Sequence, residues 1–350
     1  MRMRLSVVIR TFTEGRWDSF VAAITSVQEQ RLAPEEIVVV VDHNPDLLAK
    51  VRRQFPDAVA VENSMARGSS GGWNTGIAVA RHDVIAFLDD DAVAAPDWLQ
   101  WLQSGYQSDA VAGVGGAIEP AWGGGRPPWF PAGFEWVQGC TYEGLPEQRA
   151  PVRNLIGCNM SFRRQVLVEL GGFGEGMGRV GDDDQVMAGF WQSGGKRGYF
   201  HGCDETLLCI RLRQRFPEAL LLYEPRARVY HSIPANRKTW SYFRSRCYLE
   251  GCSKALVAQL VGAQDGLSAE RAHLLRALPR VFSRGLADTA IRHDLTGLAR
   301  AGAVAAGVAI TASGYLSGLA FLRVTEGWGA GLRSNPGFLS QGEKIRDDAG

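Results

Sequence analysis

Short apolar runs alternate with amphipathic stretches along the first part of the chain. Residues 5–9, 37–41 and 84–88 are continuous apolar runs rich in β-branched side chains, which is typical of buried strands. Residues 18–30 have the mixed pattern of an amphipathic helix, and a helical stretch near 74–80 precedes the third run. Buried strands that alternate with helices predict an α/β fold with a mostly parallel sheet flanked by helices.

The pattern changes after residue 233, where helix-forming residues predominate. We predict helices near residues 238–261, 269–284 and 288–322, so that a helical extension follows the α/β part. Residues 331–350 are polar, and we expect them to be a disordered tail.

One stretch within the extension carries no charge. Residues 301–322 contain no Asp, Glu, Lys or Arg, and Arg300 and Arg323 close the stretch. As a helix it is long enough to cross a bilayer core of about 30 Å. It is rich in Ala and Gly, however, which add little transfer energy, so a buried C-terminal helix and a membrane contact are both open.

Composition narrows the class of protein. The chain has 350 residues with a formal net charge of +1, which gives no electrostatic case for nucleic acid as a partner. Its six cysteines show no CxxC pair, which disfavours zinc and favours free thiols in a reducing cytoplasm. The N-terminus lacks the apolar segment and cleavage site of a signal peptide, so we expect a cytoplasmic protein.

Polar residues end the predicted strands. The first ends in Arg10 and Thr11, the second in Asp42, and the third in an acidic triplet at 89–91. In parallel sheets ligands collect beyond these carboxyl ends. Three adjacent carboxylates raise one another's pKa unless a cation compensates them, and hard oxygen ligands suit Mg²⁺ or Mn²⁺. The alternative is a solvated turn that caps the next helix.

The triplet and its surroundings resemble a known enzyme family. An apolar strand, three acidic residues and then Pro-Asp-Trp-Leu at 96–99 look like the metal-binding region of family 2 glycosyltransferases, which have the Rossmann-like GT-A fold. In that family the first and last acidic residues of the triplet bind the metal. The resemblance therefore implies Mn²⁺ or Mg²⁺ held by Asp89 and Asp91. In the family a His that follows a later strand completes the metal site, and His231 matches that position.

Other segments resemble the family's donor-binding strands and turns. Residues 7–11 are similar to its first strand and turn, residues 39–42 to its second strand, and residues 67–76 to its Asn/Arg-Gly…Asn-x-Gly segment. The resemblance implies donor contacts from Arg10, Thr11, Asp42, Arg67, Asn74 and Asp90. Arg237 is our preferred contact to the diphosphate, because a guanidinium fork matches its oxygens.

The family's catalytic acidic pair is matched by residues 204–211. Glu205 falls on the catalytic-base position and Asp204 on its partner, at the start of a helix-like run. Leu207 departs from the family, which often has a second Asp there. The stretch before the pair is also longer than usual and contains three aspartates at 182–184, which are an alternative location for the base.

Aromatic residues gather around a glycine loop at 123–125. They either stack on an acceptor or simply pack the loop down: Trp122, Trp129, Phe130, Phe134 and Trp136.

Together these observations predict a function and a domain order. Residues 1–235 form the GT-A nucleotide-sugar-binding and catalytic domain, and residues 236–330 form the helical region. The resemblance implies an inverting transfer from a nucleoside-diphosphate sugar, with UDP favoured, to a lipid-linked or small-molecule acceptor hydroxyl. Peripheral contact with the inner face of the cell membrane through 301–322 would suit a lipid-linked acceptor. The alternatives are a sugar nucleotidyltransferase, which the missing Gly-rich phosphate loop disfavours, and a non-catalytic nucleotide-sugar-binding scaffold.

Overall fold

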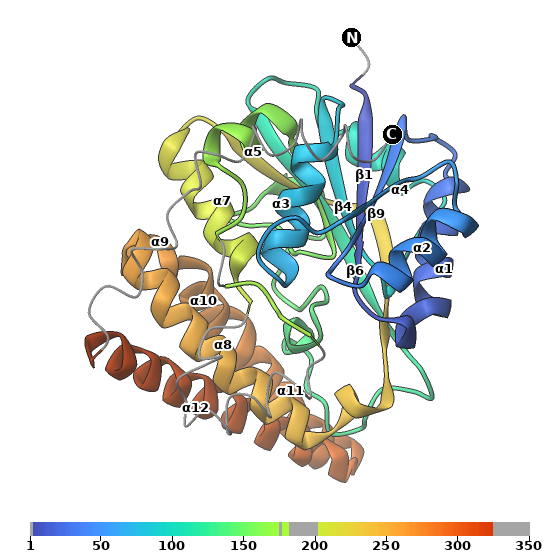
Figure 1. The fold of residues 1–350 in the computed structure, drawn as a ribbon. Helices are drawn as coiled ribbons and strands as arrows, with labels where there is room; N and C mark the ends of the chain where they lie inside the picture. The colour runs from blue at the N-terminus through green and yellow to red at the C-terminus, as the bar shows by residue number, and fades with distance from the viewer. Residues whose placement is uncertain (1–2, 175–176, 182–201, 325–350) are drawn as a thin grey trace.

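A single sheet forms the centre of the protein (Figure 1). The computed structural model describes residues 3–174, 177–181 and 202–324, and in this part of the chain the sheet has nine strands. Their order is β3-β2-β1-β4-β8-β6-β9-β5, with β7 paired to β9. The strands are β1 (Leu5–Thr11), β2 (Glu36–Val41), β3 (Val59–Glu62), β4 (Val84–Asp89), β5 (Ala92–Ala94), β6 (Val111–Trp122), β7 (Ala150–Pro151), β8 (Asn159–Arg163) and β9 (Leu220–Ile233).

Most of these strands run in one direction. β1 to β4 are parallel to one another. β8 is antiparallel to both β4 and β6, so β6 and its parallel neighbour β9 run the same way as β1. Within the described residues, β5, β7 and β8 are the reversed strands. The prediction of an α/β fold with a mostly parallel sheet is therefore confirmed.

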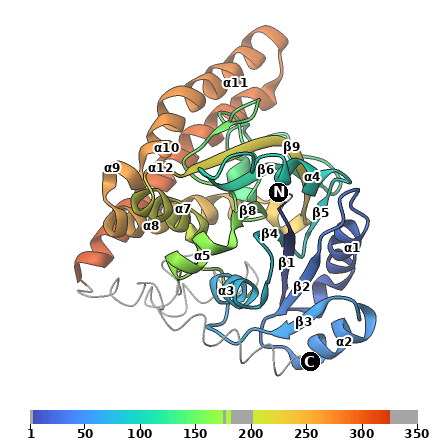
Figure 2. The same cartoon turned by 90° about the horizontal axis from the view of Figure 1, so that it is seen from above.

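Helices cover both faces of the sheet (Figure 2). Because side chains alternate along a strand, Val7 and Ile9 pack with α1 and α2, whereas Val8 packs with α3 and α7. This alternation explains why the strands are apolar at every position. The helices are α1 (Trp17–Gln28), α2 (Pro45–Gln54), α3 (Ser69–Val79), α4 (Trp98–Gln103), α5 (Arg164–Leu170) and α7 (Asp204–Arg215), with 3-10 turns at η1 (Glu14–Arg16) and η2 (Glu135–Gln138).

The C-terminal part is helical, as predicted, but its boundaries differ. It comprises η3 (Ala235–Lys238), α8 (Trp240–Val261), α9 (Ala263–Gly266), α10 (Ser268–Ala272), the π-helical turn η4 (His273–Ala277), α11 (Leu278–Arg292) and α12 (Leu295–Val324). The helix predicted over 288–322 is interrupted, because His293 is left-handed with φ of 55° and ends α11. The Asp294 carboxylate then accepts a hydrogen bond from the Thr296 backbone and starts α12. The predicted tail at 331–350 lies outside the described residues.

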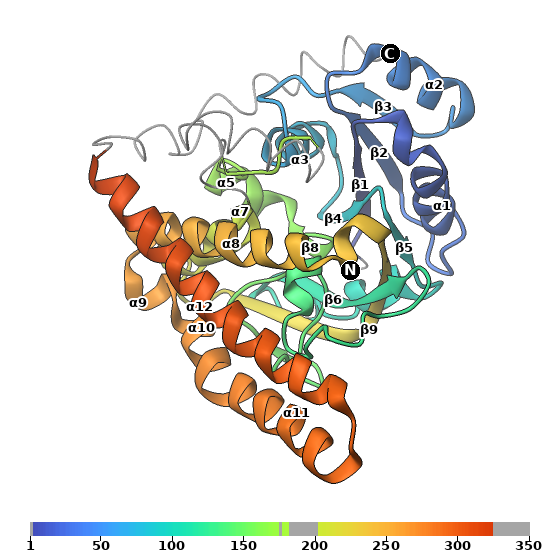
Figure 3. The same ribbon diagram turned by 90° about the horizontal axis from the view of Figure 1, so that it is seen from below.

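Glycines hold α12 against α8 on the side of α8 away from the sheet (Figure 3). A Cβ on Gly314 would overlap the Tyr248 carbonyl oxygen, and one on Gly251 would overlap the Thr311 carbonyl oxygen. The two backbones approach closely because these side chains are missing. α12 is also long and apolar enough to cross a membrane. Only 22% of its most apolar 18-residue stretch is buried within the protein. It is therefore not the buried core helix that was one of the two open interpretations.

Candidate functional site

A cavity of about 590 Å³ lies at the carboxyl ends of β1 and β4. It continues between the sheet and the helices α7, α8 and α10 to α12. Eight of the predicted site residues line it: Arg10, Asp89, Asp90, Asp91, Asp204, Glu205, His231 and Arg237. The topology thus brings together residues that lie far apart in the sequence.

Strand pairing places the acidic triplet beside a histidine. β5 follows the triplet directly and pairs with β9 so that Ala92 lies opposite His231. Asp91 Oδ1 is 3.1 Å from His231 Nε2, and Asp91 Oδ2 is 3.1 Å from Arg16 Nη1 and 3.7 Å from Arg237 Nη1. Asp91 is therefore a buried carboxylate compensated by three cationic side chains.

These contacts give the carboxylates of Asp90 and Asp91 different pKa values. Burial would raise the pKa of Asp91, but His231 and then Arg237 and Arg16 hold it well below its usual range. Burial disfavours the charged form of His231 too and would lower its pKa. The neighbouring Asp91 carboxylate outweighs burial and raises the pKa of His231 to about 10. Asp90 differs, because burial and then the Asp91 charge raise its pKa to about 6. The triplet thus combines a firmly ionised carboxylate with one that ionises only near neutral pH.

The donor atoms fit a divalent cation. The ligand atoms of Asp89, Cys158 and His231 lie within 4.8 Å of one another, and Asp90 Oδ2 is buried without a hydrogen-bond partner among the described residues. Carboxylates suit both Mn²⁺ and Mg²⁺, and imidazole suits Mn²⁺. His231 binds a cation only as a neutral imidazole, so metal binding has to displace the proton that Asp91 stabilises on it. Cys158, which was not predicted, belongs to this cluster, whereas Asp91 is ion-paired with His231, Arg16 and Arg237. Metal binding by Asp89, Asp91 and His231 stays a prediction.

Two arginines border the triplet from β1 and η1. Arg10 was predicted, and its Nη2 lies 3.8 Å from Asp89 Oδ1 while its guanidinium lies over the Trp73 ring at 5.2 Å. Arg16 was not assigned to the site, although its Nη1 is also 3.2 Å from Asp90 Oδ1. These cations balance the carboxylates of the triplet.

The other predicted donor residues support the walls of the cavity without lining it within the described part of the chain: Thr11, Asp42, Arg67 and Asn74.

Their contacts explain these positions. Asp42 accepts from the Gly68 backbone at 2.9 Å and from Asn63 at 2.6 Å. The Asn74 amide donates to the Phe173 carbonyl and accepts from the Phe173 backbone N–H, at 2.9 and 2.7 Å. Thr11 is buried, and the Arg67 guanidinium donates to the His43 carbonyl. Donor contact by these four residues stays a prediction.

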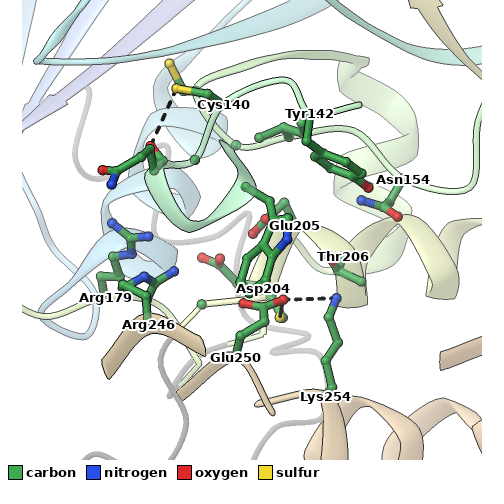
Figure 4. A pocket seen from close by; sticks show the side chains of 18 of the residues that line it. Cys140, Tyr142, Asn154, Arg179, Asp204, Glu205, Thr206, Arg246, Glu250 and Lys254 are labelled. Atoms are coloured by element: carbon green, nitrogen blue, oxygen red, sulfur yellow. Dashed lines mark hydrogen bonds and ion pairs between the residues drawn. The ribbon is translucent and has the colours of Figure 1, made fainter. Parts of the chain in front are cut away.

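The acidic pair begins α7, as expected (Figure 4). Cys203 is left-handed with φ of 66°, which turns the chain so that the first helical residues face the cavity. Asp204 is held in place because its Oδ2 accepts from the Ser69 and Ser70 hydroxyls at 3.2 and 3.0 Å. Burial and then the Asp204 charge raise the pKa of Glu205 well above its usual value. A carboxylate with a raised pKa at a cavity wall has the properties of a general base.

A charge cluster links this helix start to the C-terminal helices. Lys254 on α8 lies 3.4 Å from Glu250 and 2.8 Å from Glu270 on α10 (Figure 4 shows the first contact). Arg153 donates two hydrogen bonds to Glu270, at 2.6 and 2.8 Å, and the Cys203 thiol donates to Glu250 at 3.2 Å. The helical part is therefore fastened to the residue that precedes the acidic pair.

The aromatic cluster mostly packs the loop down. Phe130 and Phe134 are buried against Phe243 of α8, Leu278 of α11 and Val304 of α12. Phe134 and Trp136 also line the cavity, and stacking of these two on an acceptor stays a prediction.

Sequence reasoning missed several lining residues: Arg16, Cys158, Arg153, Glu250, Lys254 and Glu270. Most of these come from segments whose contacts with α7 and β4 depend on long-range packing. The three aspartates at 182–184 lie outside the described residues, so the structure does not test them as the alternative base.

Comparisons with known proteins agree with one another. Residues 6–171 match the sequence model of glycosyl transferase family 2. The chain is 35% identical over 260 residues to the glucosyl-dolichyl phosphate glucuronosyltransferase of Haloferax volcanii, an alignment that covers 73% of this chain and 77% of that protein. It is 25% identical over 255 residues to the succinoglycan biosynthesis protein ExoM of Rhizobium meliloti, which covers 71% and 69% of the two chains.

Among solved structures, the chain is similar to a mannosyltransferase from Pyrobaculum calidifontis in complex with GDP-Man and Mn²⁺. The TM-score is 0.48 at 17% identity, and the alignment covers 99% of this chain and 85% of that one.

Proposed function

The chain belongs to glycosyltransferase family 2 and is an enzyme that transfers glycosyl groups, and from this premise we propose that it is a metal-dependent, inverting transferase with Glu205 as its base. One observation carries the proposal. The acidic triplet with His231 and the Asp204–Glu205 pair line the same cavity, although the triplet and the pair lie far apart in the sequence. A cation site and a base at one cavity are what a displacement at a sugar carbon requires.

The acidic end of the cavity suits the diphosphate of the donor. Asp89 and His231 would hold Mn²⁺ or Mg²⁺ together with the unpartnered oxygen of Asp90 or with Asp91, which the family resemblance implies. Such an ion, when bound, neutralises charge on diphosphate oxygens. Arg237 is buried to 5% exposure beside Asp91 and lines the cavity, so its guanidinium is placed to contact the leaving diphosphate. The nucleotide is proposed to be UDP, which is the family's commonest.

Glu205 would act on the acceptor. Its carboxylate takes the proton of the acceptor hydroxyl while the oxygen attacks the anomeric carbon and the bond to the diphosphate breaks. Single displacement of this kind inverts the anomeric centre. The raised pKa makes Glu205 a stronger base than an exposed glutamate, because burial and Asp204 both disfavour its charged form.

The acceptor is proposed to be lipid-linked. Part of the cavity lining is apolar and comes from the C-terminal helices, through Leu274, Leu278, Val308, Ala312 and Leu316. An apolar wall suits a hydrocarbon chain better than a soluble sugar. The relative from Haloferax volcanii is named for a dolichyl phosphate, which agrees with this choice.

Calorimetric titration with a panel of UDP-, GDP- and dTDP-sugars tests the proposal. We expect one nucleotide to bind in the presence of Mn²⁺ and the binding to vanish with EDTA. Binding that EDTA leaves unchanged would refute the metal site. Metal-dependent binding without transfer to any polyprenyl-phosphate acceptor would favour the non-catalytic scaffold.

A further inference from the structure

α12 turns an apolar face to the outside of the molecule. Its exposed residues recur with the period of a helix and carry one charge among the described residues, that of Arg323. They are Leu295, Leu298, Ala299, Gly302, Ala305, Ala309, Ala312, Ser313, Leu316, Ala320, Arg323 and Val324. Leu295 is 79% exposed and Leu316 is 65% exposed. The water-facing side of a helix ordinarily carries charged residues, so this face requires an apolar covering.

The surroundings of this face are cationic. The segment from α10 to α12 contains seven arginines but only three acidic residues, Glu270, Asp288 and Asp294. Four of the arginines form no ion pair within the part of the chain that the structure describes: Arg271, Arg276, Arg280 and Arg323. An apolar face in a segment with an excess of unpaired cations complements a bilayer with anionic headgroups.

The packing of α12 decides how it meets that bilayer. Gly251 of α8 lies against Thr311 and Tyr315, so the neighbouring Glu250 and Lys254 lie at the same level as the middle of α12. If α12 crossed the bilayer, these charges and their partner Glu270 would enter the hydrocarbon. Charged side chains at the bilayer centre are strongly disfavoured. On its other side α12 packs against α11, which carries Arg280, Arg284 and Arg292.

We infer that α12 lies in the plane of an anionic membrane surface, with its exposed face among the acyl chains, and does not cross the membrane. Leu274 and Leu316 both line the cavity and are exposed, at 45% and 65%, so the cavity opens at the edge of this face. A lipid-linked acceptor can then enter from the bilayer while its sugar reaches Glu205. The acceptor route rests on the proposed function, whereas the placement of α12 does not.

Depth measurements with spin labels separate the two orientations. The variants Ala299→Cys, Ala309→Cys and Ala320→Cys place single labels along the exposed face, and the six native cysteines are all buried. In full-length protein on phosphatidylcholine/phosphatidylglycerol vesicles, an in-plane helix predicts similar shallow depths at all three positions. A spanning helix would place the central label about 15 Å deeper than the outer two, given the helical rise of about 1.5 Å per residue, and this result would overturn the inference.

Vesicle co-sedimentation tests the chemistry of the face without relying on turnover. Leu298→Glu combined with Leu316→Glu should weaken binding at least about tenfold, because two exposed leucines lose their burial in lipid. Leu220→Glu is the matched control, since Leu220 is 40% exposed on β9, and its binding should be unchanged.

A third variant isolates the contribution of charge. Arg276→Gln with Arg280→Gln should lower binding to anionic vesicles about tenfold and leave binding to pure phosphatidylcholine vesicles unchanged. Circular dichroism confirms that each variant is folded. Wild-type protein that binds neither kind of vesicle would refute the inference and indicate that protein covers the face.

Discussion

At the scale of single residues, the site works through unequal environments of similar side chains. Asp90 and Asp91 are both buried, yet three cations keep Asp91 ionised while burial and the Asp91 charge raise the pKa of Asp90 to about 6. Asp204 is oriented by two serine hydroxyls, whereas Glu205 faces the cavity with a raised pKa. The fold thus separates charge-holding carboxylates from one suited to take up a proton.

The Asp204 charge, after burial, raises the pKa of Glu205 and is therefore expected to shift the pH at which Glu205 can act as a base. A general base must be deprotonated, so activity rises as pH rises through its pKa. Asp204→Asn removes a negative neighbour and keeps an oxygen for the Ser69 and Ser70 hydroxyls, so the pKa of Glu205 falls. We expect the acidic limb of the pH profile of kcat to move to lower pH. A limb that stays in place would show that the Asp204 charge does not act on the base.

Asp91 is expected to organise the donor end. Asp91→Asn removes the charge that balances His231, Arg16 and Arg237. Donor affinity in Mn²⁺ should fall at least about tenfold, or roughly 1.4 kcal/mol, because His231 and the two arginines lose the carboxylate that positions them. Asp83→Asn is the control, because Asp83 precedes the opposite end of β4 and is partly exposed. Equal donor affinity of the Asp91 variant and wild type would remove Asp91 from the donor site.

At the scale of elements, the contact between α8 and α12 couples the catalytic helices to the apolar surface. It depends on glycines at positions where a side chain has no room. The same α8 carries Lys254 and Glu250, which reach α10 and the thiol before α7. A displacement of α12 is therefore expected to disturb the start of α7.

Gly314→Ala tests this contact. The added methyl group would overlap the Tyr248 carbonyl oxygen, and overpacking of this kind destabilises by about 1–3 kcal/mol. We expect a lower free energy of unfolding in urea and a lower kcat. Gly302→Ala is the matched control in the same helix, because no atom lies within 4 Å of its Cβ position. That variant should be neutral or slightly stabilised, by up to about 1 kcal/mol. Equal destabilisation of both variants would contradict the packing argument.

At the scale of the whole molecule, the sequence predicts the mostly parallel sheet, and the acidic triplet and the Asp204–Glu205 pair that it singles out line one cavity, while their roles stay predictions. Apolar runs identify β1, β2 and β4, because buried parallel strands are apolar throughout. The residues that contact these motifs in the folded protein could not be predicted from apolar runs. Cys158 and Arg16 join the acidic triplet through long-range packing that leaves no periodic signal. Asn74 looks like a donor contact in the sequence, but its amide is satisfied by Phe173, which only the fold shows.

The central claim is that one cavity holds the donor at the acidic triplet and the base at Glu205. The most direct measurement compares Glu205→Gln with wild type for donor affinity and for single-turnover transfer. The account predicts a donor Kd within about twofold of wild type and a transfer rate lower by about 10²–10⁴-fold, because the variant keeps the donor end and lacks the base. A Glu205→Gln enzyme that transfers sugar at the wild-type rate would contradict the account.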